Sequence, residues 1–557
     1  SGERFQGGTL QGIRSKLDYL QGLGVTALWI SPVFKQREHL DTYHGYGIQD
    51  FVDVDPRFGT REDLVALVEA AHQKGLRVIL DIIFNHSGAN WVYPGDAMQL
   101  PYRPYPGRYP FGRWLDASGR PVPVIRGRGD GVWPVELQNP EYYTRAGTGD
   151  LGAGDINDPH AEHKRTDFGN LRDFNLEAPG LLTDLALCYQ YWIALTDCDG
   201  FRIDTLKHVS LEEARNFCGA LKEFAANIGK ENFFLVGEIA GGDYAQDRYL
   251  DVLARNLNAA LDIGAMRLTL NGVAKGLVPP EAYFSGFDPG DAEMGSHRNL
   301  GERHVSILDD HDHVFGEKLR FSSRAASPHQ VAAGVGLQLF SLGIPCIYYG
   351  TEQAFAGPEP SEWMWLPGWG SSDRYLREAM FGPEHPRKGL SGRDPDLPGF
   401  GPFGTAGHHC FDRHHPAYLR IAAMNAVRRA FPVLRHGRQY LRPTAFLGRP
   451  FAFHGPGEIA AWSRILHDEE ALCVMNTHGW EPRGADCLVD ATLNPEGAAM
   501  TVVLNTAQAG GSHPEGSTVE VKRTGDGKHF LAIRDLPPSE ILVLSNHPVA
   551  DEGGFVP

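Results

Sequence analysis

Residues 60–83 read TREDLVALVEAAHQKGLRVILDII, and this stretch establishes the fold class. Thr60 has the features of a helix N-cap, with Asp63 three residues later, and Gly75 ends the helix. The apolar face of that helix consists of Leu64, Leu67, Val68 and Ala71. An apolar run at residues 76–83 follows at once and predicts a buried strand. The stretch is therefore one helix–strand unit of an α/β protein.

Short apolar runs continue to alternate with amphipathic segments on both sides of this unit. Six further strands are predicted, at residues 25–30, 200–204, 233–238, 260–263, 304–308 and 346–349. Strands separated by helices imply a parallel sheet, and seven of them are one short of a (β/α)8 TIM barrel. We expect the missing first strand upstream of Ser1 and the barrel domain over residues 1–435.

Two regions depart from the barrel pattern. Residues 87–175 show no regular pattern and are rich in Gly, Pro, Arg and aromatic residues. This segment is too long for a plain loop, so it predicts an inserted subdomain B. Beyond residue 435 the helical patterns stop. Short alternating segments at residues 459–463, 471–475, 500–504 and 540–544 predict a C-terminal antiparallel β-sandwich over residues 436–557.

The composition excludes several classes of partner. The chain has 557 residues, with 52 Lys and Arg against 69 Asp and Glu, a net charge of −17. An acidic protein is a poor partner for nucleic acid or an anionic membrane, but not for a neutral sugar. No apolar run approaches the ~18 residues of a membrane helix. No signal peptide is visible in this chain, and both a cytoplasmic and a secreted location stay open. The sequence also leaves the oligomeric state open.

The seven cysteines have no CxxC spacing, which argues against a zinc site and against a dense disulfide framework. Most are expected to be small core residues. One disulfide, between Cys473 and Cys487, is left open.

Polar residues gather where the predicted strands end. The clusters are Asp81 with Asn85 and His86; Arg202 and Asp204 with Lys207 and His208; Glu238; and Asp309 to His313. Barrel enzymes carry out their chemistry at the carboxyl ends of the strands, so clusters on four different strands indicate one active site.

These residue types suit the cleavage of a glycosidic bond. That reaction needs one carboxylate to attack the anomeric carbon and one carboxylic acid to protonate the leaving oxygen. Arg202 lies two residues before Asp204, on the same side of the strand, and should keep it ionised. Burial and neighbouring carboxylates should raise the pKa of Glu238. A metal hydrolase is disfavoured because there is no HExxH and no compact His/Asp cluster.

At these residues the sequence resembles the α-amylase family of glycoside hydrolases, glycoside hydrolase family 13. The similar segments, in chain order, are YHGY (43–46), DIIFNH (81–86), GFRIDTLKH (200–208), VGE (236–238), DHD (310–312) and IPCIYYGTEQ (344–353). The family's barrel, inserted B domain and C-terminal sandwich agree with the organisation predicted above. One departure is Asp310, where the family usually has Asn.

The resemblance implies a role for each site residue. Asp204 would be the nucleophile, Glu238 the general acid/base, and Asp312 would hold the sugar hydroxyls of the distorted ring. Implied substrate-binding residues are His44, Tyr46, His86, Arg202, Lys207, His208, His311, Asp373 and Arg377. The chemistry would need no cofactor.

A structural Ca²⁺ is also implied, although not every member of the family binds one. The implied ligands are Asn85, Asp173 or Asn175, and the backbone of His208.

The sequence therefore predicts a retaining enzyme that hydrolyses α-1,4-glucosidic bonds in α-glucans or malto-oligosaccharides. A 4-α-glucanotransferase would share every catalytic residue and stays open as the alternative. A non-catalytic, amylase-like binding subunit is the remote alternative, because all three catalytic residues are present. Trp363, Trp365 and Trp369 could stack on sugar rings or simply pack their loop.

Overall fold

The computed structural model describes residues 8–37, 39, 43–239, 252–287, 301–313, 318–355, 373–380, 410–507 and 511–547, without the side chains of residues 374 and 375. The chain divides into two compact units. The N-terminal unit consists of residues 3–21 and 25–261, and the C-terminal unit of residues 1–2, 22–24 and 262–557.

A parallel sheet forms the centre of the N-terminal unit. Its strands, in spatial order, are β1 (Ala27–Ile30), β4 (Arg77–Ile82), β10 (Gly200–Ile203), β11 (Phe234–Gly237) and β12 (Ala259–Leu261). Each lies within a strand predicted from the sequence or starts one residue before it. Because the strands are parallel, their carboxyl ends meet at one edge of the sheet.

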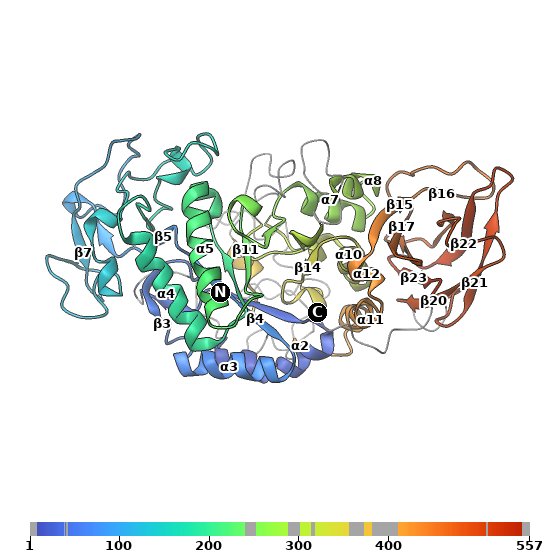
Figure 1. Cartoon of the computed structure of the whole chain (residues 1–557), viewed down its shortest axis with the longest axis horizontal. Helices are drawn as coiled ribbons and strands as arrows, with labels where there is room; N and C mark the ends of the chain where they lie inside the picture. Colours follow the sequence, from blue (N-terminus) through green and yellow to red (C-terminus); the bar gives the residue numbers. More distant parts are fainter. Residues whose placement is uncertain are drawn as a thin grey trace. The chain divides into compact units, whose positions relative to one another are not determined.

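Helices cover this sheet, and their caps are local. The long ones are α3 (Arg61–Gln73), α4 (Leu181–Thr196) and α5 (Leu211–Asn227), with α1 (Leu10–Ser15) and α2 (Leu17–Leu23) at the start of the chain. Thr60 and Asp63 form a capping box at α3, as predicted, and Ser210 with Glu213 does the same at α5. Helices α4 and α5 lie side by side in Figure 1.

The segment between β4 and β10 has little regular structure. It contains the pair β5 (His86–Ser87) and β9 (Arg172–Asp173), and a small sheet of β6 (Trp91–Val92), β7 (Arg113–Leu115) and β8 (Pro121–Val122). Buried aromatic rings form its core, among them Trp91, Tyr93 and Tyr143. The β5–β9 pair places Asp173 directly opposite His86.

The C-terminal unit contains two further parallel strands, β13 (His304–Ile307) and β14 (Ile344–Cys346). Its helices are α7 (Ala265–Ala274), α8 (Glu281–Phe284), α10 (Pro328–Phe340), α11 (Pro416–Ala430) and α12 (Val433–His436). Strand β14 starts two residues and ends three residues before the predicted strand at 346–349, because its pairing with β13 runs from Ile344 to Cys346. Tyr348 and Tyr349 leave the ladder and pack against the Arg320 guanidinium.

Nine antiparallel strands follow, drawn in orange and red in Figure 1. They are β15 (Arg438–Arg442), β16 (Thr444–Ala445), β17 (Ile459–Leu466), β18 (Glu469–Asn476), β19 (Arg483–Leu488), β20 (Ala499–Asn505), β21 (Thr518–Arg523), β22 (His529–Leu536) and β23 (Ile541–Ser545). Val474 of β18 and Ile533 of β22 lie far apart in the strand order but share one core. The sheet therefore folds on itself as the predicted sandwich.

The disulfide left open by the sequence does not form. All seven cysteines are free, and both Cys473 in β18 and Cys487 in β19 are buried. These two strands are not neighbours in the sheet. Among the described residues, no helix combines the length and the apolar character needed to cross a bilayer.

Candidate active site

Asp204 and Glu238 leave neighbouring parallel strands at the same level. In the register of β10 with β11, Ile203 pairs with Gly237, and the Glu238 amide donates to the Ile203 carbonyl at 2.9 Å. Each carboxylate is the next residue along its strand, so the two side chains begin about 4.8 Å apart, the usual spacing of paired strands. Both are almost fully buried.

Arg202 connects three carboxylates. Its Nη1 donates to Asp204 Oδ1 at 2.6 Å and to Asp81 Oδ1 at 3.0 Å, and its Nη2 donates to Glu238 Oε2 at 2.9 Å. The guanidinium is buried, so these charge-assisted bonds are little weakened by water. The sequence correctly predicted that Arg202 and Asp204 share one side of the strand.

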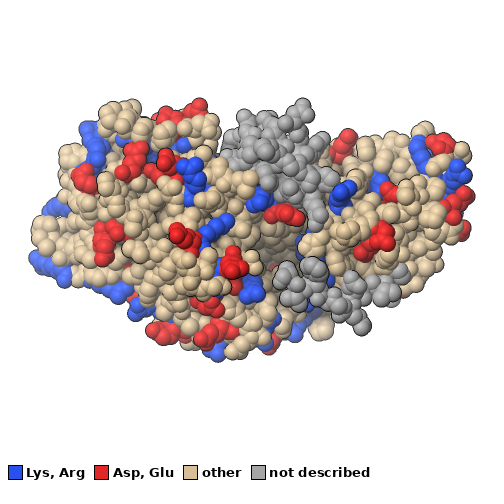
Figure 2. All heavy atoms as spheres, viewed as in Figure 1, with Lys and Arg blue, Asp and Glu red and all other residues tan. Residues whose placement is uncertain are grey.

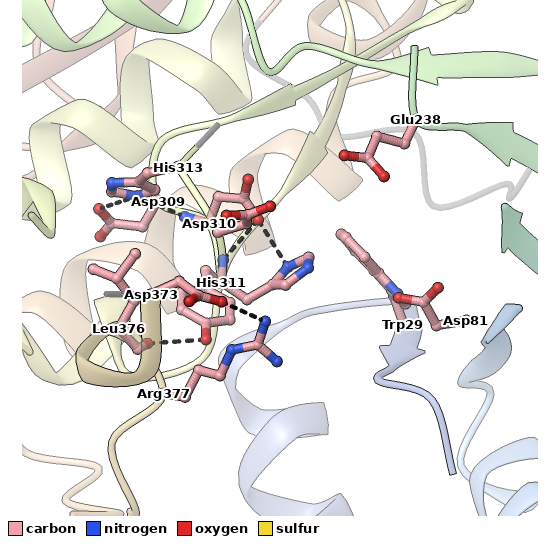
Figure 3. Close-up of polar contacts among 12 residues, drawn as sticks. Trp29, Asp81, Glu238, Asp309, Asp310, His311, His313, Asp373, Leu376 and Arg377 are labelled. Carbon is pink, nitrogen blue, oxygen red and sulfur yellow. Dashed lines mark hydrogen bonds and ion pairs between the residues drawn. The ribbon is translucent and has the colours of Figure 1, made fainter. Parts of the chain in front are cut away.

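Asp81 is held in turn by two aromatic side chains. Trp29 Nε1 and the Tyr46 hydroxyl each donate to Asp81 Oδ2 at 3.0 Å, and Figure 3 shows the indole beside the carboxylate. The Arg202 guanidinium lies 5.1 Å from the Trp29 ring centroid. Sequence reasoning missed Trp29, because a Trp within an apolar strand gives no signal that its N–H faces a polar centre.

Burial and charge separate the protonation states of the two carboxylates. Burial raises the pKa of Glu238 to about 8; the Arg202 charge opposes this, while the charge of Asp204 adds to it. Burial also raises the pKa of Asp204, although Arg202 and a hydrogen bond from Glu238 oppose it. Arg202 thus acts in the predicted direction but does not outweigh burial. The pair is suited to hold one proton, on Glu238, beside an ionised Asp204.

Histidines and aromatic rings surround this centre within the N-terminal unit. His44 stacks on Tyr46 with ring centroids 5.8 Å apart, and His86 packs on Phe168 at 5.2 Å. His86 Nε2 is buried without a hydrogen-bond partner, and burial lowers the His86 pKa to about 3. A neutral imidazole with an unused nitrogen can bond a hydroxyl group.

Lys207 and His208 lie in the 3₁₀ helix η5 (Leu206–His208), directly after Asp204. His208 Nδ1 contacts the His163 carbonyl at 2.5 Å, and burial lowers the His208 pKa to about 4. The ring is therefore neutral and fixed, whereas the Lys207 side chain is only half-buried.

The residues after β13 form their own polar cluster in the C-terminal unit. Asp310 Oδ1 lies 2.8 Å from His311 Nδ1 and accepts the His311 amide at 2.6 Å (Figure 3). Burial would raise the Asp310 pKa, but the charge and hydrogen bond of His311 hold it well below its usual value. The carboxylate that replaces the family's Asn is thus paired with its own neighbour.

Three other predicted site residues of this unit form ion pairs. Asp312 is 41% exposed and its Oδ1 lies 2.7 Å from Lys318 Nζ, a partner that the sequence analysis missed. Asp373 and Arg377, both predicted to bind a sugar, pair at 3.1 Å across η9 (Asp373–Leu376). Trp363, Trp365 and Trp369 lie outside the described residues.

The residues implied as calcium ligands lie together in the N-terminal unit. Asn85, Asn175 and His208 line one cavity of about 230 Å³. Asp173 is fully buried beside it on β9; its Oδ2 has no hydrogen-bond partner, and burial raises its pKa well above the usual value. A buried carboxylate oxygen without a partner is costly, and a cation removes that cost.

Comparison with protein families agrees with this arrangement. The family model described as "Alpha amylase, catalytic domain" matches residues 1–396. The chain belongs to the α-amylase family. Curated relatives of this family member include the α-amylase of Streptomyces lividans, 29% identical over 523 residues, 86% of this chain and 52% of the relative. A cyclomaltodextrinase from a Bacillus species is 26% identical over 358 residues, 63% of this chain and 53% of the relative. The chain thus spans about half the length of these two proteins.

Solved structures of α-amylase family members share the fold. The α-amylase of Geobacillus thermoleovorans, crystallised with acarbose, superposes with a TM-score of 0.64 at 21% identity, over 98% of this chain and 94% of that structure. A cyclomaltodextrin glucanotransferase with a three-domain ABC distribution gives a TM-score of 0.68 at 20% identity, covering 98% and 92%. The predicted (β/α)8 barrel with an inserted domain and a C-terminal antiparallel domain is confirmed.

Proposed function

We propose that this chain is a retaining α-glycosidase that hydrolyses α-1,4-glucosidic bonds in α-glucans or malto-oligosaccharides. One observation carries the proposal: Asp204 and Glu238 face each other from adjacent strands, and Arg202 bonds to both. A nucleophile and an acid at this spacing are what the retaining mechanism requires.

In the first step, Asp204 attacks the anomeric carbon while the Glu238 proton passes to the glycosidic oxygen, so that the aglycone leaves. A covalent glycosyl–Asp204 ester remains. In the second step Glu238, now a carboxylate, takes a proton from water, whose oxygen displaces Asp204 from the same carbon. Arg202 stabilises the carboxylate that is negative at each stage, since it bonds to both.

The remaining site residues are proposed to hold the substrate. Asp312 would bind hydroxyls of the distorted sugar, a role supported by its position in the DHD segment at residues 310–312. Further proposed contacts are His44, Tyr46, His86, Lys207, His208, His311, Asp373 and Arg377. We also propose the domain limits: residues 1–435 for the barrel, residues 87–175 for subdomain B inserted in it, and residues 436–557 for the C-terminal sandwich.

We propose a neutral polysaccharide as the binding partner of this protein. On the face drawn in Figure 2, acidic and basic side chains are interspersed and do not gather into one basic area. A nucleic-acid partner would call for such an area. The net charge of −17 supports the same choice.

Transfer to another sugar is the second candidate, 4-α-glucanotransfer. It is favoured by the names of two similar proteins, the cyclomaltodextrinase and the cyclomaltodextrin glucanotransferase. Incubation with maltoheptaose and chromatography of the products separates the candidates. Shorter sugars alone support hydrolysis, and longer ones transfer. An unchanged substrate would contradict both and leave a binding protein.

The product of hydrolysis is expected to be the α-anomer. Two displacements occur at the anomeric carbon, each inverts it, and the starting configuration returns. The adjacent strands leave little room between Asp204 and Glu238 for the water of an inverting enzyme, whose carboxyl groups stand about 6.5–9.5 Å apart. Proton NMR of fresh product, before mutarotation, measures the anomer. A β-anomer formed first would rule out the assigned pair.

We also propose a structural Ca²⁺ site formed by Asn85, Asp173 and the backbone carbonyl of His208, with Asn175 at its edge. The unpartnered oxygen of Asp173 supports it. Three cationic side chains line the same cavity but bond elsewhere: Lys164 donates to the Ile156 carbonyl, Arg165 to the carbonyls of Arg103 and Gly107, and Arg108 to Glu141 Oε2. A bound cation would fasten the inserted segment to the strand ends.

Chelation is therefore expected to destabilise the protein. A site saturated 100-fold above its Kd contributes about 2.7 kcal/mol, and its loss lowers the Tm of a chain of 557 residues by about 2 °C. Differential scanning calorimetry with EDTA, and then with excess Ca²⁺, measures the shift. Asp173→Asn should lower Tm and abolish the response to EDTA. An equal Tm in EDTA and in Ca²⁺ for the wild type would exclude the site.

A further inference from the structure

An exposed aromatic side chain marks a cavity in the C-terminal unit. Trp480 is 75% exposed, on the loop between β18 and β19, and it lines a cavity of about 520 Å³. Two more exposed apolar side chains of α7 and its end line the same cavity: Leu268, 48% exposed, and Leu277, 68% exposed. Exposed apolar side chains grouped around a cavity are typical of a ligand-binding site.

The Trp480 loop is held firmly where it packs against two helices. Gly276 ends α7 with φ +68, and a Cβ there would lie 2.6 Å from the Thr477 carbonyl oxygen. A Cβ on Gly479 would lie 2.8 Å from the Cβ of Ala326, just before α10. Both backbones therefore approach their neighbours too closely for a side chain. The indole is presented on a rigid support, which lowers the entropy cost of binding.

The polar lining offers hydrogen-bonding groups that suit the hydroxyls of a sugar. Asn271 and Gln330 contribute planar amide groups, and no Asp or Glu lines the cavity among the described residues. Four cationic side chains also line the cavity, Arg267, Lys275, Arg320 and Arg324, and each interacts with another group. Arg320 pairs with Glu378 at 2.7 Å, and Lys275 Nζ lies 4.4 Å from the Phe321 ring centroid. The lining thus combines an aromatic plane with amide groups and cationic donors, which can contact the rings and the hydroxyl oxygens of a sugar.

We propose that this cavity is a second carbohydrate-binding site, which takes a stretch of α-glucan with one pyranose ring stacked on Trp480. A pyranose has an apolar face and a rim of hydroxyls, which match an indole plane beside amide groups. The volume lies within the range of small-ligand sites. The identity of the ligand rests on the proposed function, since a polymeric substrate can occupy two sites at once.

The lining of this cavity differs from the set of residues proposed for catalysis. Among the described residues, none proposed above for catalysis or substrate binding lines it, whereas His313, which ends the Asp309–His313 cluster, does. Two sites on one polymer raise the effective concentration of the chain at the catalytic centre. Attachment to a long or insoluble glucan should therefore depend on Trp480, and turnover of a short soluble sugar should not.

Adsorption to insoluble starch tests the proposal. Trp480→Ala is expected to weaken adsorption about tenfold, because truncating a stacked Trp commonly removes that much affinity. Trp480→Phe, which keeps a ring, should retain most of it. Phe453→Ala is the matched control, since Phe453 is an exposed aromatic residue of the same unit that does not line the cavity.

Kinetics on a short aryl maltoside, measured on the same samples, separate the possible failures. For Trp480→Ala, kcat and KM should match the wild type. Unchanged adsorption of Trp480→Ala would overturn the second site, as would equal losses in adsorption and in turnover of the short substrate. A wild type that neither cleaves the maltoside nor adsorbs to starch would overturn the proposed function and the second site together.

Discussion

Replacing Asp204 with Asn should lower kcat on maltoheptaose by on the order of 10⁴-fold or more, the size of loss seen when a catalytic nucleophile is removed. The amide keeps the shape of the side chain but cannot form the glycosyl ester. The fold should persist, because Arg202 retains its bonds to Asp81 and Glu238. Circular dichroism and steady-state kinetics on the same sample measure both quantities.

A matched variant lies at the other end of the same strand. Asp199 precedes β10 and pairs with His72 at 2.7 Å, far along the strand from the cluster around Arg202. Asp199→Asn makes the same chemical change and should leave kcat near the wild-type value. If Asp204→Asn kept more than a few per cent of the activity with an intact fold, Asp204 would not be the nucleophile.

The sequence predicted the placement of the carboxylates well, because strand periodicity and strand ends are local properties. The run that ends at Gly237 determines which residue leaves the strand next, and the same holds for Ile203 and Asp204. Parallel pairing then brings the two ends together without any further information.

What the sequence did not predict depends on three-dimensional environment. The bond from Trp29 to Asp81 joins two strands, and no spacing in the chain encodes it. The pKa of Asp204 reflects a competition between burial and Arg202, and only a packed structure supplies the extent of burial. The pairing of Asp310 with His311 likewise explains an added carboxylate that the motif alone left unexplained.

Replacing Glu238 with Gln should produce a loss that depends on the leaving group. On maltoheptaose we expect kcat to fall by about 10²–10⁴-fold, the usual contribution of general acid–base catalysis. On an aryl glycoside with a good leaving group, bond cleavage needs no proton, so glycosyl–enzyme formation should be affected far less. Single-turnover kinetics on both substrates measure that step. Equal losses on the two substrates would argue that Glu238 is not the acid.

The pH dependence gives an independent reading of the same residue. Burial raises the Glu238 pKa to about 8, so the carboxyl is protonated and able to donate below that pH. In the wild type, kcat/KM should therefore decline as the pH rises through about 8, and this alkaline limb should be absent in Glu238→Gln. Glu213→Gln is the control, because burial also raises the pKa of Glu213, while its side chain caps α5 and lines the cavity proposed for Ca²⁺. If the limb vanished in Glu213→Gln and persisted in Glu238→Gln, the acid would have to be sought elsewhere.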